Sequence, residues 1–461
     1  MSTISLSNVS FSYDASNIIL DDVSVVFTDS ERVAIVGDNG AGKTTVLKLL
    51  TGDIVPDSGQ VSRGASVYMT RQINAATSKS GGERQGAELA RAFDSGAAIL
   101  LLDEPTNNLD AEARRRFFNN LASYPFGAVI VSHDRELLRQ VDRIIEIRQG
   151  KIRVWGGNYD FWIAGRCAEQ ENIFAKYTAA QKEISRLGAT MNIAQNTRQH
   201  HEVKQRKEIV NTRRSRIAAN ALKGKSQETE SKRRAIIQQK LNAQMELRQT
   251  LATQMQEDKI KIPLPSKPFY SKELVHISGL VFGYDAATVL NNFNLVMFGG
   301  QRIRITGRNG AGKSTLLKII CGDLVPWAGT VKTFGKIAYL DQDLSLLDKN
   351  KSVVDNIVDI AGVRSHDAHV IAANFGFRGD SSKKQVGILS GGELLKATLA
   401  AILGGENQPD LLILDEPTNN LEIKSIAILE DALNQYRGAI LLVSHDEMFV
   451  KNIKIDYEIQ I

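Results

Sequence analysis

The octapeptide GDNGAGKT occupies Gly37–Thr44, and a near copy, GRNGAGKS, occupies Gly307–Ser314. Each follows a β-rich run, Arg32–Val36 or Arg302–Thr306, and precedes a run of helix-forming residues. Glycines let backbone N–H groups wrap around phosphate oxygens, and the N-terminus of the following helix directs a partial positive charge at them. The repeated strand–loop–helix order therefore predicts two phosphate-binding loops.

The side chains of these loops are those that bind ATP and Mg²⁺. Lys43 and Lys313 are expected to reach the β- and γ-phosphates, and Thr44 and Ser314 are expected to bind Mg²⁺. The other loop residues expected to contact ATP are Gly37, Asn39, Gly40, Gly42, Thr45, Gly307, Asn309, Gly310, Gly312 and Thr315.

Two fully apolar runs, ILLLDE (99–104) and LLILDE (411–416), each end in a pair of carboxylates. Such runs are typical of central strands in a parallel sheet, and ligands bind at the carboxyl ends of those strands. The first carboxylate of each pair is expected to hold Mg²⁺, and the second to position and deprotonate the attacking water. Taken alone, an Asp-Glu pair after a strand is equally often a helix cap. Here each pair follows a phosphate-binding loop along the chain, which favours a catalytic role. The pairs are Asp103–Glu104 and Asp415–Glu416.

The same ordered set of motifs occurs twice along the chain, which predicts two similar domains. His133 and His445 each follow a second apolar run within VSHD, where a matched histidine suits a γ-phosphate sensor. SGGE occurs at Ser80 and Ser390 before helix-forming runs and could by itself be only a helix cap. Only seven residues separate Gln72 from the first SGGE, whereas the second copy carries about forty more residues there.

Between the copies, the stretch Asn158–Asp258 lacks proline and is rich in helix-forming residues. Two antiparallel helices with a turn near residue 208 are expected. Apolar residues spaced four and three apart form a coiled-coil seam on the first helix. On the second, one face is expected to carry Ile237, Leu241 and Met245 and a neighbouring face Leu247, Leu251 and Met255. The first seam comprises Ile173, Tyr177, Ala180, Ile184, Leu187 and Met191.

Charge is distributed unevenly along the chain. Residues 166–261 carry 20 Lys or Arg against 10 Asp or Glu, so this segment has a net charge of +10 in a chain whose total is +5. Such a basic segment suits a polyanion such as nucleic acid, although charged surface helices are common. The residues expected to contact RNA are Arg198, Lys204, Arg206, Lys207, Arg213, Arg214 and Arg216.

Taken together, the motifs resemble those of the ABC-F family of ATPases, which have two ABC cassettes, a helical linker and no membrane domain. The expected fold is α/β, with two P-loop ABC-type nucleotide-binding domains, residues 1–157 and 266–461, joined by a helical hairpin, residues 158–265. No secretory signal or membrane-spanning run is found, and the two cysteines lie far apart. A monomeric cytoplasmic protein is expected.

The resemblance implies that each ATP is sandwiched between the P-loop of one cassette and the SGGE signature of the other. It implies that Gln72 and Gln342 bind ATP and Mg²⁺, and that Tyr13 and Tyr284 stack on adenine, although lone aromatics are more often core residues. The signature residues that it implies are Ser80, Gly81, Gly82, Ser390, Gly391 and Gly392.

The chain departs from the family pattern at Lys79, where a leucine usually precedes the first signature. It also departs in the motifs NNLD (Asn107–Asp110) and NNLE (Asn419–Glu422), where many relatives have His at the second position and where Glu422 takes the place of Asp110. These departures distinguish the two ATP sites from each other. Every catalytic residue is nevertheless present, so both sites are expected to bind and hydrolyse ATP.

Family members act on the ribosome, so the resemblance implies 23S rRNA and the P-site tRNA as partners of the linker. The short first cassette and long hairpin are more similar to the branch that protects ribosomes from antibiotics bound near the peptidyl-transferase centre or exit tunnel. The alternatives are a translation factor that relieves stalled ribosomes without drug protection, a DNA-associated ATPase, and a transporter ATPase.

Overall fold

The computed structural model describes residues 2–14, 17–70, 81–107, 109–211, 232, 235–252, 260, 262–263, 272–285, 287–341, 344–419 and 421–461. The chain divides into two compact units. The first unit consists of Met1–Trp162, which we call the N-lobe, and Asp258–Ile461, which we call the C-lobe; the second unit is Ile163–Glu257.

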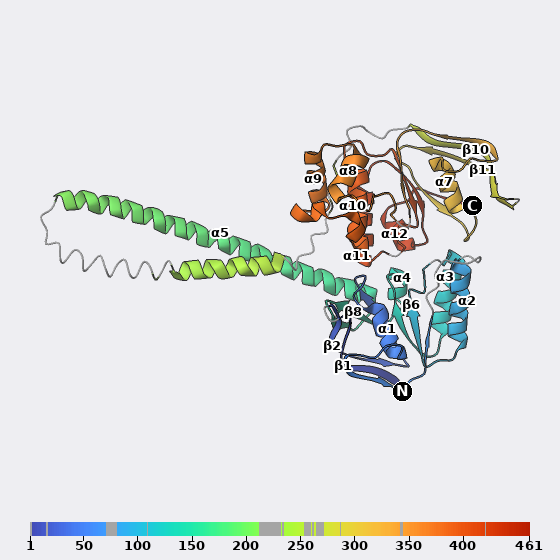
Figure 1. The fold of residues 1–461 in the computed structure, drawn as a ribbon, viewed down its shortest axis with the longest axis horizontal. Helices are drawn as coiled ribbons and strands as arrows, with labels where there is room; N and C mark the ends of the chain where they lie inside the picture. Colours follow the sequence, from blue (N-terminus) through green and yellow to red (C-terminus); the bar gives the residue numbers. More distant parts are fainter. Residues whose placement is uncertain are drawn as a thin grey trace. The chain divides into compact units, whose positions relative to one another are not determined.

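The N-lobe contains two sheets (Figure 1). Strands β2, β1 and β4 form an antiparallel sheet, in that order. A six-stranded sheet has the order β5-β6-β7-β3-β8-β9 and is parallel except for β9. The strands are β1 (Thr3–Asp14), β2 (Asn17–Thr28), β3 (Arg32–Gly37), β4 (Ser58–Arg63), β5 (Val67–Met69), β6 (Ile99–Asp103), β7 (Gly127–Val131), β8 (Arg143–Arg148) and β9 (Lys151–Trp155).

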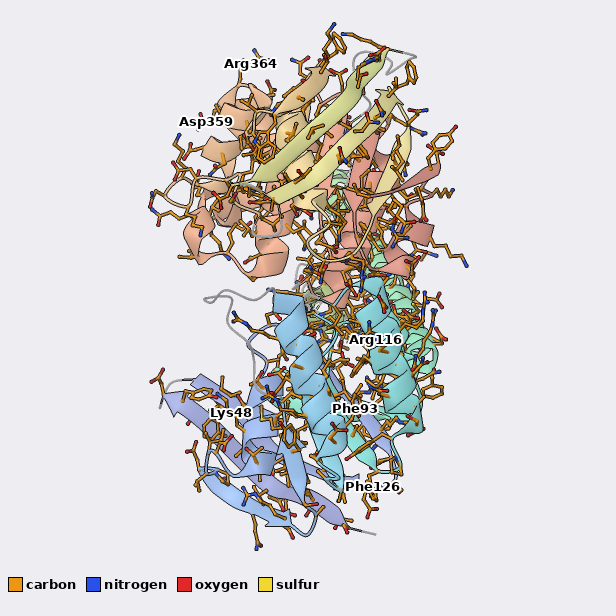
Figure 2. All side chains as sticks on the ribbon, turned by 90° about the vertical axis from the view of Figure 1, so that its right-hand side faces the viewer. Lys48, Phe93, Arg116, Phe126, Asp359 and Arg364 are labelled. Carbon is orange, nitrogen blue, oxygen red and sulfur yellow. The ribbon has the colours of Figure 1, made fainter. Side chains whose placement is uncertain are left out.

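Four helices accompany these sheets. They are α1 (Lys43–Thr51), α2 (Gly81–Asp94), α3 (Ala111–Ser123) and α4 (Arg135–Leu138). Figure 2 labels Phe93 on α2. Its ring centroid lies 6.0 Å from that of Phe117 in α3 and 5.8 Å from that of Tyr124 just after α3, so an aromatic cluster joins the two helices. Every residue of β6 and β7 is buried, as expected of apolar central strands.

The C-lobe repeats the arrangement with sheets of order β11-β10-β13 and β14-β15-β16-β12-β17. Its strands are β10 (Glu273–Tyr284), β11 (Ala287–Phe298), β12 (Arg302–Thr306), β13 (Ala328–Thr333), β14 (Ile337–Leu340), β15 (Leu411–Asp415), β16 (Ala439–Val443) and β17 (Tyr457–Gln460). Its α-helices are α7 (Lys313–Cys321), α8 (Val353–Ala361), α9 (Ser365–Asn374), α10 (Gly391–Leu403), α11 (Ile423–Gln435) and α12 (Glu447–Asn452).

The two lobes differ in the segment that leads to the signature helix, which is α2 in the N-lobe and α10 in the C-lobe. In the C-lobe, β14 is followed by α8, α9 and the 3₁₀ turns η1 (Gly379–Lys383) and η2 (Val386–Ile388) before α10 begins. In the N-lobe, only residues 70–80 separate β5 from α2. The additional residues of the second copy therefore form a helical layer, which packs on the C-lobe core through Val353, Ile357 and Ala372.

The second unit is helical. Helix α5 (Tyr159–Asn211) starts in the N-lobe and continues into this unit, and residues 235–252 form a second helical stretch. The two stretches pack in register, since Arg248 Nη1 donates a hydrogen bond to Gln181 Oε1 at 3.3 Å. Helix α5 continues through residue 208, so the chain does not turn there as expected.

The structure confirms the seam on α5 and shows which residues of the return helix are least exposed. Ala180 and Leu187 are buried, whereas Met245 and Leu247 are each 44% exposed. The less exposed face of the return takes residues from both expected faces: Ile237, Leu241, Gln244, Arg248 and the buried Leu251. Heptad spacing continues through two polar residues on that face, Gln244 and Arg248, which a pattern of apolar residues alone does not include.

In the part of the chain that the structure describes, no helix is sufficiently long and apolar to span a membrane.

Candidate nucleotide-binding sites

Each phosphate-binding loop ends at a position where only glycine fits. Gly42 has φ 100° and precedes α1, and Gly312 has φ 97° and precedes α7. A Cβ atom would lie 2.6 Å from Ile19 Cγ2 at the first position and 2.6 Å from Val289 Cγ1 at the second. The predicted loop–helix junctions are therefore present in both lobes. Of the other predicted loop glycines, Gly40 and Gly310 lie in the turns, whereas Gly37 ends β3 and Gly307 directly follows β12.

The loop lysines are buried and held in matching poses. Lys43 Nζ donates hydrogen bonds to Gly37 O at 2.7 Å and Asp38 O at 3.2 Å. Lys313 repeats this with two carbonyls of its own loop, at 2.8 and 3.1 Å. Burial lowers the pKa of both ammonium groups, and nearby carboxylates oppose that shift. A phosphate could replace these carbonyl partners.

The first carboxylate of each pair has a different partner in the two lobes. Thr44 Oγ1 donates to Asp103 Oδ2 at 2.8 Å, which brings together two of the predicted Mg²⁺ ligands. In the C-lobe, Tyr339 Oη donates to Asp415 Oδ2 at 3.2 Å. Strand register places Met69 where the C-lobe has this tyrosine, so sequence comparison of the motifs alone did not reveal it.

The second carboxylates lie on a strained backbone. Glu104 and Glu416 both have φ 47°, in the left-handed region that residues other than glycine seldom adopt. Their amides donate to Val131 O and Val443 O, at 2.9 and 2.8 Å, which fixes the turn. Burial raises the pKa of Glu104 to about 8 and that of Glu416 to about 7. Such carboxylates are poised to accept a proton near neutral pH.

The two predicted sensor histidines face these carboxylates. His133 Nε2 lies 3.7 Å from Glu104 Oε1, and His445 Nε2 lies 3.3 Å from Glu416 Oε1, without hydrogen-bond geometry in either pair. Burial lowers the pKa of His133 to about 3 and that of His445 to about 4, so both imidazoles are neutral at pH 7. Both Nε2 atoms are buried without a hydrogen-bond partner, which is expected where a ligand supplies one.

Within the first unit, each phosphate-binding loop contacts the opposite lobe. The amide of Asn39 donates to Glu422 Oε1 at 2.6 Å, and the amide of Asn309 donates to Asp110 Oδ2 at 3.3 Å. A Cβ atom at Gly391, in the second signature, would lie 4.0 Å from Asn39 Nδ2. The first loop thus lies beside the signature of the C-lobe. Sequence reasoning singled out the NNLD and NNLE positions but missed these contacts.

The second signature begins α10. Ser390 is the N-cap, and its side chain accepts from the amide of Glu393 in a reciprocal capping box, with Gly391 and Gly392 in the first turn. In the N-lobe, Gly81 and Gly82 are the first residues of α2. Three further predicted ligands lie outside the described residues: Gln72, Ser80 and Gln342.

The two tyrosines expected to stack on adenine lie beside the loops. Tyr13 Oη is 3.2 Å from Thr45 Oγ1, and Tyr284 Oη is 3.2 Å from Thr315 Oγ1. The rings remain 58% and 49% exposed, respectively. Both rings are therefore open to a planar ligand and are not part of the core. Ser314, the remaining predicted Mg²⁺ ligand, is also exposed at the start of α7.

Known proteins are similar to this chain over most of its length. A protein-family model described as "ABC transporter" matches residues 20–79 and 290–419. The "ATP-binding protein Uup" of Caulobacter vibrioides is 31% identical over 95% of this chain and 74% of its own length. The chain belongs to the ABC-F family of ATPases.

Two other relatives extend the comparison. "ABC transporter F family member 2" of Arabidopsis thaliana is 28% identical over 98% of this ABC-F chain and 75% of its own length. "Energy-dependent translational throttle protein EttA" of Mycobacterium tuberculosis is 26% identical over 94% and 87%. A solved structure of a complex of archaeal ribosomal stalk protein aP1 and ribosome recycling factor aABCE1 matches with a TM-score of 0.59 at 18% identity, covering 97% of this chain and 86% of that one, and shows a shared fold.

The predicted fold class is therefore confirmed: the chain is an α/β protein with two ABC cassettes, and it is an ATPase. The side chains of each site have the properties expected of an ATP site. Each offers a buried ammonium group whose partners are loop carbonyls, a neutral histidine with an unpartnered Nε2 atom and a buried carboxylate. The oxygen ligands Thr44 and Asp103 are of the kind that Mg²⁺ prefers.

Proposed function

We propose that this ABC-F ATPase closes its lobes on two ATP molecules and acts in that closed state on the ribosome. Two features support the proposal: the net charge of +10 on residues 166–261 between the cassettes, and a relative whose name is that of a translational throttle. Neutralising backbone phosphates with such a segment yields binding that weakens with salt.

In each proposed ATP site, the residues have separate roles. Lys43 and Lys313 neutralise phosphate charge, and the carboxylates Glu104 and Glu416 orient water and accept its proton. His133 Nε2 and His445 Nε2 hydrogen-bond the transferred group. Thr44 and Asp103 in one site, and Ser314 and Asp415 in the other, would hold Mg²⁺, which would neutralise phosphate charge when bound.

Closure joins each P-loop to the other cassette, which links ATP to the position of the lobes. Asn39 and Asn309 already contact Glu422 and Asp110 across the lobes. A γ-phosphate beside Gly391 would add a ligand to that same interface, where the N-terminus of α10 favours an anion. Hydrolysis removes this ligand and lets the lobes separate.

The partners proposed for the linker are 23S rRNA and the P-site tRNA. The side chains of Arg198, Lys204, Arg206 and Lys207 lie on the part of α5 whose side chains are not described, and Arg213, Arg214 and Arg216 lie outside the described residues. Their assignment therefore rests on charge alone.

The finer proposal is protection of the ribosome from antibiotics bound near the peptidyl-transferase centre or the exit tunnel. The brief passage from β5 to α2 favours it, because the N-lobe has no counterpart of α8 and α9 among its described residues. The alignment with the Arabidopsis relative spans 547 positions, whereas this chain has 461 residues. That relative therefore carries insertions that this chain lacks. The alternative is relief of stalled ribosomes without drug protection.

Ribosome sedimentation tests the first proposal. The double variant Glu104→Gln/Glu416→Gln should pellet with ribosomes in ATP and not in ADP, because it binds nucleotide without removing the γ-phosphate. The matched variant Arg213→Gln/Arg214→Gln/Arg216→Gln in the same background should pellet less while ATP affinity is unchanged. Pelleting with DNA or membranes instead of ribosomes would refute the assignment.

Drug susceptibility tests the finer proposal. Expression in a susceptible host should raise the inhibitory concentration of at least one lincosamide, pleuromutilin, streptogramin, phenicol or macrolide. The hydrolysis-deficient double variant, expressed equally, should not. If no drug responds while ribosome association persists, the chain is a translation factor of the alternative kind.

A further inference from the structure

Arg304 is a buried arginine in the strand that leads into the second P-loop. The residue is 4% exposed and lies in β12 between β16 and β17. Its neighbours Ile303 and Ile305 belong to the apolar core on one face of the sheet, so Arg304 lies on the other face. The corresponding residue of β3 is Ala34, between Val33 and Ile35. The guanidinium is therefore particular to the C-lobe.

The Arg304 side chain holds the loop that carries His445. Its Nε and Nη2 atoms donate to Ser444 O at 3.2 and 2.9 Å. Its Nη2 and Nη1 atoms also bind the carboxylate of Glu447, the first residue of α12, at 2.6 and 3.2 Å. Both ends of the His445 segment are thus attached to one rigid, planar group.

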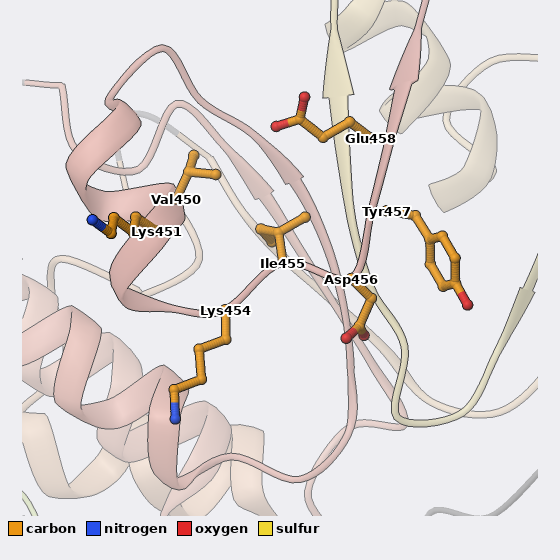
Figure 3. Close-up of a pocket in the computed structure, with 7 residues that line it drawn as sticks. All are labelled: Val450, Lys451, Lys454, Ile455, Asp456, Tyr457 and Glu458. Carbon is orange, nitrogen blue, oxygen red and sulfur yellow. The ribbon is translucent and has the colours of Figure 1, made fainter.

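A second carboxylate binds Arg304 from the neighbouring strand. Arg304 Nη1 donates to Glu458 Oε1 at 2.8 Å. Figure 3 shows Glu458 leaving β17 on the side of α12, while Tyr457 leaves it on the opposite side. The side chains of Glu447 and Glu458 are 63% and 54% exposed, so both carboxylates stay hydrated if the arginine is removed.

The matching loop of the N-lobe is held in another way. Arg114 of α3 binds Asp134 at 2.7 Å, and Arg135 Nη1 binds Glu430 Oε1 of the C-lobe at 2.7 Å. Arg135 occupies the position that Glu447 occupies after His445. The segment after the N-lobe histidine therefore depends partly on the opposite lobe, whereas that of the C-lobe is attached to its own sheet.

We propose that Arg304 is a positioning residue of the second ATP site, fixing the Ser444 peptide so that His445 stays aligned beside Glu416. The inference rests on the assignment of His445 to that site and is independent of the ribosome. Misplacing a group that contacts the transferred phosphate by about 1 Å can slow the reaction by as much as about 10²-fold. The first site gains the equivalent alignment in part from the contact between the lobes.

Single-turnover hydrolysis, with protein in excess over ATP, tests the proposal one site at a time. Arg304→Met, which keeps most of the side-chain volume, is placed in a Glu104→Gln background to report the second site and in a Glu416→Gln background to report the first. We expect the rate to fall roughly 10-fold in the former and to stay within about 2-fold in the latter. Affinity for a fluorescent ATP analogue should not change in either, because Arg304 lies outside the P-loop.

Two carboxylate variants supply matched controls. Glu447→Gln weakens the hold on the His445 segment and should reproduce part of the loss at the second site. Glu458→Gln leaves every contact to that segment and should retain the parental rate. An equal fall at both sites, or no fall at the second with the unfolding temperature maintained, would overturn the proposal.

Discussion

At the scale of single residues, the two glutamates proposed to be catalytic, Glu104 and Glu416, hold protons that the unfolded chain would release. Burial raises the pKa of Glu104 to about 8 and that of Glu416 to about 7, so each contributes less stability as pH rises from about 4.5 through these values. Glutamine has no proton to lose. We expect Glu104→Gln/Glu416→Gln, free of nucleotide and Mg²⁺, to unfold at the parental temperature or slightly above it at pH 6, and roughly 2–5 °C above it at pH 9.

Differential scanning calorimetry at pH 6 and pH 9 measures how the difference in unfolding temperature between variant and parent widens with pH. His133 and His445 are neutral in the folded state over this interval, with pKa values of about 3 and 4, and their titration in the unfolded state is common to both proteins and cancels in the comparison. Glu171→Gln, at an exposed position of α5, is the control and should show no such widening. A gap that narrows with rising pH would show that the carboxylates are stabilised as anions in the folded protein.

At the scale of elements, the helical unit depends on a narrow apolar seam. Leu187 of α5 is 5% exposed, whereas Phe174 of the same helix is 59% exposed. Leu187→Ala should cost about 1–3 kcal/mol of local stability, because it removes buried methyl groups that few neighbours can replace. Hydrogen exchange of α5 amides should then be roughly tenfold faster or more, since about 1.4 kcal/mol corresponds to a factor of ten.

The control for the seam is Phe174→Ala, which should leave exchange near the parental rate. ATP hydrolysis should be unchanged in both variants, since neither residue lies in a nucleotide site. Equal protection in the two variants would mean that α5 is stable without its seam.

At the scale of the whole molecule, a buried ion pair connects the lobes next to the first site. The side chains of Arg135 and Glu430 are 5% and 12% exposed. Reversing one charge buries two like charges, which costs about 3–5 kcal/mol at such a pair. We expect Arg135→Glu or Glu430→Arg alone to lower steady-state ATP hydrolysis more than tenfold, and the double reversal to recover much of it.

The control is the exposed pair Lys151–Asp21 within the N-lobe, 61% and 50% exposed, where charge reversal should change hydrolysis little. X-ray scattering of the single reversals with ATP should show lobes that close less. Failure of the double reversal to recover activity would show that the pair does not act as a unit.

The sequence by itself determined the parts of this protein that depend on short-range pattern. Loop glycines, apolar strands with carboxylates at their ends, and helices around both sets of motifs follow from local propensity and spacing, and the strands β3, β6, β12 and β15 lie within a residue of where they were expected. The seam on α5 followed for the same reason.

Only the tertiary structure decided which distant side chains meet. Arg304 reaches Ser444 because β12 pairs with β16 in one register, and Tyr339 reaches Asp415 because β14 pairs with β15. Arg135 meets Glu430 because the lobes pack together. Strand register and lobe packing are set by the summed burial of whole surfaces, and no local pattern around a single residue carries that information.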